Sequence, residues 1–256
     1  MKIGAQWYSV RNYLQSNEAI EQAFIKTKAL GYDCAQYSGA PNGGDFDPVF
    51  LKEMIDKYDL PINLTHISWD KITGNLDEEI KKHKAIGCYN IGLGGISADI
   101  AADKAQFDDF IAKLNGEIIP KIKDNGCKFF YHNHNFEFTK LSNGQIALDY
   151  LMENAPDLNI TLDTHWIHRG GGDVLEYIEK FAGRMECVHL KDYKMNKWEI
   201  KFAEVGEGNL NWSKILPAFE KAGVKYAFVE QDDAPDLGEP FDHLKISIDN
   251  LKKMGY

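Results

Sequence analysis

A junction of one kind recurs four times along the chain: an amphipathic stretch ends in a glycine, and a short apolar run begins directly after it. The four junctions are Leu30-Gly31-Tyr32, Ile86-Gly87-Cys88, Asn125-Gly126-Cys127 and Ala222-Gly223-Val224. Helices commonly end at glycine, because glycine adopts the left-handed backbone conformation without steric cost. The recurrence predicts that helices and strands alternate through the chain.

Eight short apolar runs are expected to be strands, and stretches of helical periodicity separate them. The expected strands span residues 2–8, 32–36, 61–66, 89–93, 128–133, 159–163, 186–190 and 226–230. Strands that alternate with helices form parallel sheets, and eight such units predict a closed barrel. The sequence therefore predicts an α/β fold, a single-domain (β/α)₈ TIM barrel over residues 1–256. The alternative is an open doubly wound sheet, but no GxGxxG motif follows the first strand.

Charge and composition exclude several classes of protein. The formal net charge of -10 disfavours a nucleic-acid-binding protein, because phosphate backbones require a basic surface. The chain has neither a signal-peptide core nor an apolar run long enough to cross a membrane, so we expect a cytoplasmic protein. The four cysteines are isolated from one another and are expected to be small buried residues rather than zinc ligands or disulfides: Cys34, Cys88, Cys127 and Cys187.

Polar side chains gather where the predicted strands end, which is where barrels of this kind place their active sites. The candidates are Gln6, Tyr8, His66, His132, His134, Glu137, Asp163, His165, His189, Lys191 and Glu230. Five of the eight histidines lie at these ends. In contrast, His83 and His243 fall in helical stretches and are expected to be exposed. Surface histidines have no preference for strand ends, so the clustering indicates a functional site.

Asp163, His189 and Glu230 end consecutive strands and should be neighbours at the mouth of the barrel. Each has an ordinary structural alternative: Asp163 could cap a helix, His189 could be a core residue, and Glu230 could begin a solvated loop. To explain these residues without a shared site, all three alternatives would have to hold at once. Two carboxylates and an imidazole that converge are typical ligands of a divalent ion such as Mn²⁺, Zn²⁺ or Co²⁺. A further carboxylate or imidazole from the fifth strand would complete four protein ligands.

Two glycine-rich stretches and several tryptophans carry weaker signals. Residues 92–95 and 169–173 could offer backbone N–H groups to an anion, although tight turns explain them equally well. Barrel phosphate sites usually follow strands seven and eight instead. Trp7, Trp69 and Trp166 lie near strand ends, where aromatic faces can pack either against a sugar ring or into the core.

Four motifs in order resemble the sugar phosphate isomerase/epimerase superfamily, whose fold is similar to that of xylose isomerase. They are Tyr131-His132-Asn133-His134-Asn135-Phe136-Glu137-Phe138, Leu162-Asp163-Thr164-His165-Trp166, Val188-His189-Leu190-Lys191-Asp192 and Glu204-Val205-Gly206-Glu207-Gly208. The resemblance covers nearly the whole chain. Epimerases of this group hold a metal with Glu, Asp, His and Glu on strands five to eight, and Asp163, His189 and Glu230 match the last three. The strand-five position carries His132 here, and the nearest acid, Glu137, is taken as the fourth ligand. This departure resembles the branch of inosose dehydratase and the 3-keto-glycoside lyases.

The resemblance and the residues together predict a metal-dependent sugar isomerase or epimerase. One divalent ion (Mn²⁺, Co²⁺, Zn²⁺ or Mg²⁺) would stabilise the enediolate formed when the proton next to a carbonyl is removed. His132 or His134 is the candidate base, Glu230 a ligand and second acid/base, and Lys191 a group that neutralises developing charge. The residues expected to contact the sugar are Gln6, His66, His165, Trp166 and Lys191.

Other outcomes stay open at this point. Expulsion of a β-substituent would make the enzyme a lyase or dehydratase acting on a keto-inositol or a 3-keto-glycoside. A DNA repair nuclease would need more histidines for a trinuclear site, and only His66 and His189 are in place. A non-catalytic sugar-binding barrel would not need its intact acidic and histidine residues. The expected partner is a small carbohydrate, with neither nucleic acid nor membrane, and the family is compatible with a homodimer.

Overall fold

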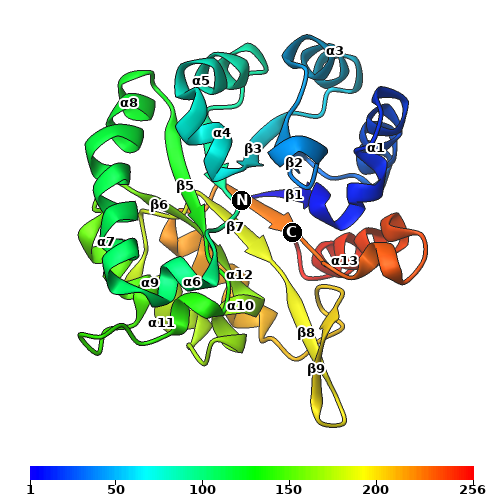
Figure 1. Ribbon diagram of the computed structural model, residues 1–256. Coiled ribbons are helices and arrows are strands. Elements are labelled where there is room, and N and C mark those ends of the chain that lie inside the picture. Colours follow the sequence, from blue (N-terminus) through cyan, green and yellow to red (C-terminus); the bar gives the residue numbers. More distant parts are fainter.

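Eight parallel strands close into a barrel in the computed structural model, which describes residues 1–256 (Figure 1). Around the barrel the order is β1-β10-β7-β6-β5-β4-β3-β2, and the pairing of β1 with β10 closes it. The barrel strands are β1 (Lys2–Gln6), β2 (Cys34–Tyr37), β3 (Ile62–Ile67), β4 (Asn90–Leu93), β5 (Lys128–His132), β6 (Asn159–Asp163), β7 (Cys187–Leu190) and β10 (Tyr226–Val229). Each overlaps its expected range, and the predicted fold class is confirmed.

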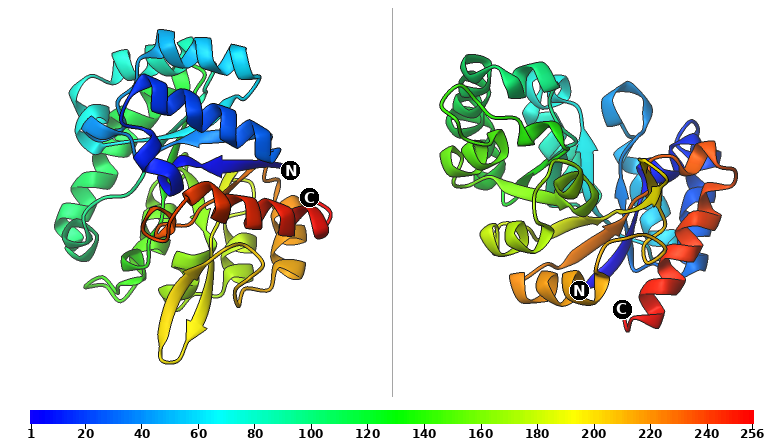
Figure 2. Two further views of the ribbon diagram at one scale, coloured as in Figure 1. Left: turned by 90° about the vertical axis from the view of Figure 1, so that its right-hand side faces the viewer. Right: turned by 90° about the horizontal axis from the view of Figure 1, so that it is seen from below.

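Helices surround the strands (Figures 1 and 2). In the first half of the chain they are α1 (Asn17–Leu30), α2 (Pro41–Gly44), α3 (Pro48–Tyr58), α4 (Trp69–Gly74), α5 (Leu76–Ala85), α6 (Ala98–Ala102), α7 (Lys104–Lys113) and α8 (Ile119–Asp124). In the second half they are α9 (Ala147–Asn154), α10 (Thr164–Arg169), α11 (Val174–Lys180), α12 (Trp212–Ala222) and α13 (Pro240–Lys253). The 3₁₀ helices are η1 (Trp7–Tyr13), η3 (Phe136–Phe138) and η4 (Ala234–Asp236), and η2 (Leu114–Ile118) is a short π-helix. None of the helices combines the length and apolar character that crossing a bilayer requires.

Helix α1 illustrates how the sequence sets the boundaries of these elements. The Ser16 hydroxyl accepts a hydrogen bond from the Ala19 N–H and caps the first turn. Ile20 and Phe24 lie one turn apart and are both buried against the barrel. Gly31 ends the helix with a φ of 87°, which a residue with a Cβ adopts only with strain. Gly223 ends α12 in the same way, with a φ of 88°.

Two local predictions differ from the structure. The first strand ends at Gln6 rather than at residue 8, because the Gln6 side-chain oxygen accepts a hydrogen bond from the Tyr8 N–H and starts the turn η1. His83 is fully buried rather than exposed: its Nε2 lies 2.7 Å from the Thr65 hydroxyl and its Nδ1 2.6 Å from the Glu79 carbonyl oxygen. His243 is partly buried, with Nδ1 2.6 Å from Oε1 of Glu204.

An antiparallel hairpin, which the sequence did not reveal, follows β7. Its strands are β8 (Asp192–Asn196) and β9 (Glu199–Ala203), and it projects away from the barrel (Figures 1 and 2). At the outer end, the side chain of Trp198 is 96% exposed. At the inner end, Phe202 packs against His165 and Trp166. The hairpin therefore extends from the edge of the site region into solvent.

The interior of the barrel is built in layers, and this layering positions the site. Five fully buried side chains from five strands form an apolar layer: Cys34, Leu64, Phe130, Cys187 and Phe228. Side chains two residues apart along a strand point to the same face. The next inward positions toward the carboxyl ends are Gln36, His66, His132, His189 and Glu230, all polar. Along each of these strands, the inward-facing side chain is apolar at one position, the apolar floor, and polar two residues later.

Candidate metal and active site

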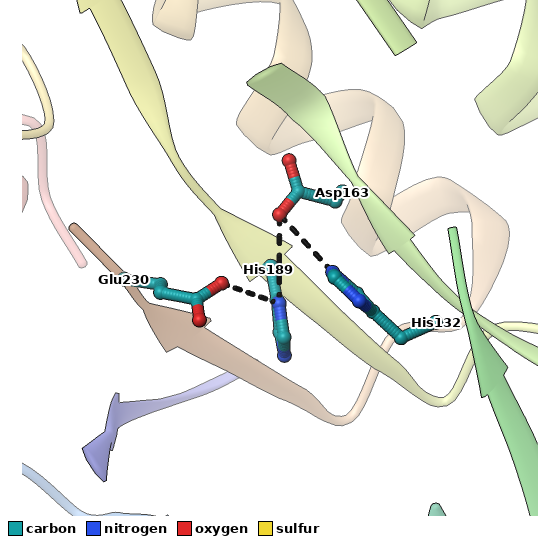
Figure 3. A group of neighbouring side chains, drawn as sticks. All are labelled: His132, Asp163, His189 and Glu230. Carbon is teal, nitrogen blue, oxygen red and sulfur yellow. Dashed lines mark hydrogen bonds and ion pairs between the residues drawn. The ribbon is translucent and has the colours of Figure 1, made fainter. Parts of the chain in front are cut away.

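Four side chains from four adjacent strands converge above the apolar floor. One potential ligand atom each from His132, Asp163, His189 and Glu230 lies within 4.8 Å of the other three, and all four residues are buried. Oδ2 of Asp163 is 3.3 Å from Nε2 of His132 and 3.5 Å from Nδ1 of His189. The latter atom is 2.8 Å from Oε2 of Glu230 (Figure 3). We call these four residues the HDHE group.

Each member of the HDHE group has a second polar atom that the protein holds in place, so that the first atom faces the centre. Nδ1 of His132 lies 3.1 Å from the Gly94 carbonyl oxygen, and Nε2 of His189 lies 2.8 Å from Oε1 of Gln36. Oδ1 of Asp163 accepts the Trp166 N–H, and Oε1 of Glu230 accepts the Gln6 side-chain amide. Such outer contacts fix the tautomer and orientation of metal-ligating side chains.

The atoms that face the centre fit a cation. Nε2 of His189 is bonded to Gln36, so Nδ1 is the ring nitrogen that faces the Glu230 and Asp163 oxygens. Nδ1 of His189 and Oε2 of Glu230 are both buried without an aligned hydrogen-bond partner. Acceptors this close to one another require a proton or a metal ion between them. Two imidazoles and two carboxylates form a donor set that suits Zn²⁺, Mn²⁺ or Co²⁺.

The ammonium group of Lys191 lies beside the HDHE group. Its Nζ is 3.3 Å from Oδ2 of Asp163, 2.9 Å from Oε2 of Glu230 and 3.0 Å from Oδ1 of Asp232. It also lies 5.1 Å from the centre of the Trp166 ring. Lys191 is buried, so its positive charge is balanced by these carboxylates rather than by solvent.

The charges of these groups shift one another's pKa values. Burial alone would favour neutral forms, but Lys191 and the imidazoles hold the pKa values of Asp163 and Glu230 well below the usual range. The pKa of Lys191 is raised, because Asp163, Asp232 and Glu230 outweigh its burial. The pKa of His189 is raised as well, because the Glu230 and Asp163 carboxylates outweigh its burial. A divalent cation would displace this proton from His189.

The sequence was compared with models of known protein families. Residues 24–254 match the model of the xylose isomerase-like TIM barrel. The chain belongs to this family. The resemblance inferred from the four motifs is thereby confirmed.

Curated relatives of this xylose isomerase-like barrel are distant. An inosose dehydratase from Clostridium perfringens is 24% identical over 139 residues, which cover 47% of this chain and 46% of the relative. One from Clostridium beijerinckii is 23% identical over 172 residues, or 59% and 57% of the two chains. The matches therefore span only about half the length of these relatives.

Solved structures share the fold of this xylose isomerase-like barrel along its whole length. A sugar phosphate isomerase/epimerase from Parabacteroides distasonis is 20% identical with a TM-score of 0.76, over 96% of this chain and 92% of that one. A D-allulose 3-epimerase from Methylomonas sp. is 14% identical with a TM-score of 0.72, over 99% and 97%. A probable 3-DHS dehydratase from Bacillus anthracis has the same two values, over 98% and 99%. The fold thus occurs in both epimerases and a dehydratase.

A cavity of about 350 Å³ opens above the HDHE group, and most of the predicted site residues line it. These are Gln6, His66, His132, His134, Lys191 and Glu230, together with Tyr8. Asp163 and His189 lie beneath them. His165 and Trp166 do not line the cavity; they pack with Phe202 at the base of the hairpin.

Glu137, which the sequence suggested as the fourth ligand, lies outside the HDHE group. Its carboxylate accepts hydrogen bonds from the Tyr131 hydroxyl and the His134 N–H. Burial raises the pKa of Glu137 to about 7. The structure instead brings His132 to the fourth position, because strand β5 ends at that residue and its side chain points inward.

Sequence reasoning missed two residues of the site, Gln36 and Asp232. Gln36 lies two positions after the floor residue Cys34 and is the only polar side chain of its strand, so alternation along β2 could have revealed it. Asp232 follows Glu230 by two positions and lines the cavity. Its charge was visible in the sequence, but its pairing with Lys191 depends on the path of the chain after β10.

Proposed function

We propose that this barrel is a divalent-metal-dependent enzyme that removes a proton next to the carbonyl group of a sugar, and that it acts as an isomerase or epimerase. The convergence of the HDHE group carries the proposal: four buried ligand atoms face one point, and each residue is anchored by a contact outside that point. When bound, the ion would supply a Lewis acid that stabilises negative charge on the carbonyl oxygen. The family membership supports this class of chemistry.

Within the cavity, His134 is the best candidate for the base. His132 is used as a ligand in this proposal, which leaves His134 as the other histidine of the β5 motif. Nδ1 of His134 is buried without a hydrogen-bond partner. Burial, with His132 nearby, lowers the pKa of His134 to about 3, so the ring is neutral at pH 7.

Lys191 would act at the substrate oxygen. Its raised pKa keeps the ammonium group charged, and its position next to Glu230 places that charge at the floor of the cavity. An ammonium held there stabilises negative charge that develops on an oxygen of the sugar. Glu230, on the same side, stays ionised and orients Lys191.

A second candidate function, β-elimination by a lyase or dehydratase, is favoured by the asymmetry of the site. Epimerases of the superfamily are expected to use two glutamates on opposite faces of the substrate. Here Glu230 is the only glutamate that lines the cavity, and imidazoles from His66, His132 and His134 line it as well. A site with one glutamate and a separate base suits proton removal followed by loss of a leaving group. The inosose dehydratases among the relatives agree with this alternative.

The test combines metal content with proton exchange. We expect about one tightly bound divalent ion per chain by elemental analysis, and none in an Asp163→Asn, Glu230→Gln double variant. With metal restored, incubation of ketoses and 3-keto-sugars in D₂O should give deuterium at the carbon next to the carbonyl. Epimer formation would support the first candidate, and an unsaturated product the second. A protein that binds no metal and exchanges no proton would contradict both.

A further inference from the structure

The two loops where (β/α)₈ barrels usually bind phosphate, those after strands seven and eight, carry carboxylates in this chain. After β7, the loop around Gly206 and Gly208 folds over the side chain of Asp192. The Asp192 carboxylate accepts hydrogen bonds from the N–H groups of Tyr193, Gly206, Gly208 and Leu210 and from the Trp212 indole. These donors would suit an anion, but a built-in carboxylate already occupies them.

After β10, the corresponding loop contains Asp232 and Asp233. Asp232 lines the cavity, with Oδ1 3.0 Å from Nζ of Lys191. Lys191 is the only lysine or arginine that lines the cavity, and it is already shared among three carboxylates. A divalent ion in the HDHE group would bring the sum of these charges to zero, so no positive charge is left for an anionic substituent.

Several other donors near the site are also occupied. In the glycine-rich turn after α10, the N–H groups of Gly170, Gly171 and Gly172 bond to backbone carbonyls. The Gly94 carbonyl oxygen faces His132 and is an acceptor, so it cannot bind an anion. The Arg11 guanidinium lies over the ring of Tyr8, and its Nη1 donates to the carbonyl oxygens of Tyr8 and Asp232.

Away from Lys191 and its carboxylate partners, the cavity wall is polar but uncharged. Ser38, Ser68 and five glycines also line the cavity. Nε2 of His66 and Nδ1 of His134 are buried, lack hydrogen-bond partners and belong to residues that line the cavity. A neutral imidazole can donate to or accept from a hydroxyl group, so the histidines that line the cavity suit the alcohols of a sugar.

We propose that the substrate is an uncharged sugar, and that the cavity excludes sugars that carry a phosphate or carboxylate group. This inference rests on the proposed function for the choice of a sugar, and on the carboxylates Asp192 and Asp232 for the exclusion of anions. It separates this chain from any relative that acts on sugar phosphates. Asp232 is the residue that sets this specificity, because it pairs with Lys191, the one lysine or arginine that lines the cavity.

Matched pairs of probes test the proposal directly. Saturation-transfer NMR would measure binding of D-fructose against D-fructose 6-phosphate, D-ribulose against D-ribulose 5-phosphate, and D-glucose against D-glucuronate. The Mg²⁺-supplemented protein would be used at about pH 8, where histidines are normally neutral. We expect free sugars to bind at least about tenfold more tightly than their anionic partners. A His66→Phe variant, which replaces a polar lining side chain with an apolar one, should weaken the transfer.

A charge variant sharpens the test. Asp232→Asn releases Lys191 from one carboxylate, so the preference for the free sugar should shrink by about tenfold. The control, Asp233→Asn, alters the neighbouring carboxylate that does not line the cavity and should leave the preference unchanged. Anionic sugars that bind the parent protein as tightly as free sugars would overturn the proposal, as would a panel in which no free sugar binds.

The outcome also separates this inference from the proposed function. Phosphorylated sugars that bind and exchange deuterium would leave the proposed chemistry standing and remove the exclusion of anions. Free sugars that bind without exchange in the presence of every metal would support the uncharged-substrate inference and remove the proposed chemistry.

Discussion

Oε1 of Gln36 lies 2.8 Å from Nε2 of His189, so a residue of β2 orients a ligand on β7 across the interior of the barrel. These strands are not neighbours in the sheet. The contact leaves Nδ1 of His189 directed at Asp163 and Glu230. A residue outside the HDHE group thus decides which ring nitrogen is available to a metal.

Replacing Gln36 should therefore weaken metal binding without removing a ligand. For Gln36→Met we expect the affinity for Mn²⁺ or Zn²⁺ to fall about 10- to 100-fold, the range typical of such outer contacts. Equilibrium dialysis or calorimetry would measure it. Gln106→Met, at an exposed position on α7, is the matched control. Unchanged affinity in Gln36→Met would mean that His189 does not need this contact.

The identity of the fourth ligand can be tested with two variants. His132→Gln should lower metal affinity by more than about 100-fold, because loss of a direct ligand should exceed the effect of an outer contact. Glu137→Gln should leave the affinity nearly unchanged, because its carboxylate bonds to Tyr131 and His134 instead. Titration of the metal-free proteins with Mn²⁺ would compare them. The reverse order of effects would restore Glu137 as the ligand.

Lys191 should stabilise the metal-free protein. Lys191→Met leaves the carboxylates of Asp163, Glu230 and Asp232 close together in a buried site, and breaking such a pairing costs about 3–5 kcal/mol. Urea unfolding in the presence of a chelator would show the loss, and added metal should recover much of it. Lys201→Met removes an exposed ion pair with Glu199 and should cost less than about 1 kcal/mol. Equal effects of the two variants would refute this role.

Buried His83 should make the stability depend on pH. Burial lowers its pKa to about 4 from a usual value of 6.5. The unfolded chain therefore binds a proton at His83 more readily than the folded chain does. The contribution of neutral His83 to the free energy of unfolding is complete above pH 6.5 and is lost as the pH falls toward 4, by about 3 kcal/mol in all. His83→Gln should reduce the slope of the unfolding free energy over that range. Parallel pH profiles for His83→Gln and the parent protein would count against this account.

The sequence predicted the barrel well because its cues are local. The glycines at 31 and 223 end helices by their own backbone preference, and the apolar runs mark strands by composition. Asp163, His189 and Glu230 could be grouped because they end consecutive strands, and parallel strands bring their carboxyl ends to one rim. Periodicity and connectivity are therefore sufficient to predict that part of the site.

The rest depended on information that periodicity does not contain. The pairing of Lys191 with Asp232 joins two loops, and the choice between His132 and Glu137 depends on where β5 stops. His83 seemed exposed because most helical histidines face solvent, whereas here Thr65 and a backbone carbonyl satisfy both ring nitrogens inside the fold. The hairpin after β7 was hidden because its alternation is short and largely polar.

The hydrogen bond from the Gln6 side chain to Glu230, at 3.0 Å, crosses the seam where β1 pairs with β10. β1 is the first barrel strand along the chain and β10 the last, so Glu230 is anchored only where these two strands pair. A barrel in which they are not paired lacks this anchor. A metal ion that needed all four residues of the HDHE group would therefore stabilise the closed barrel over partly assembled forms.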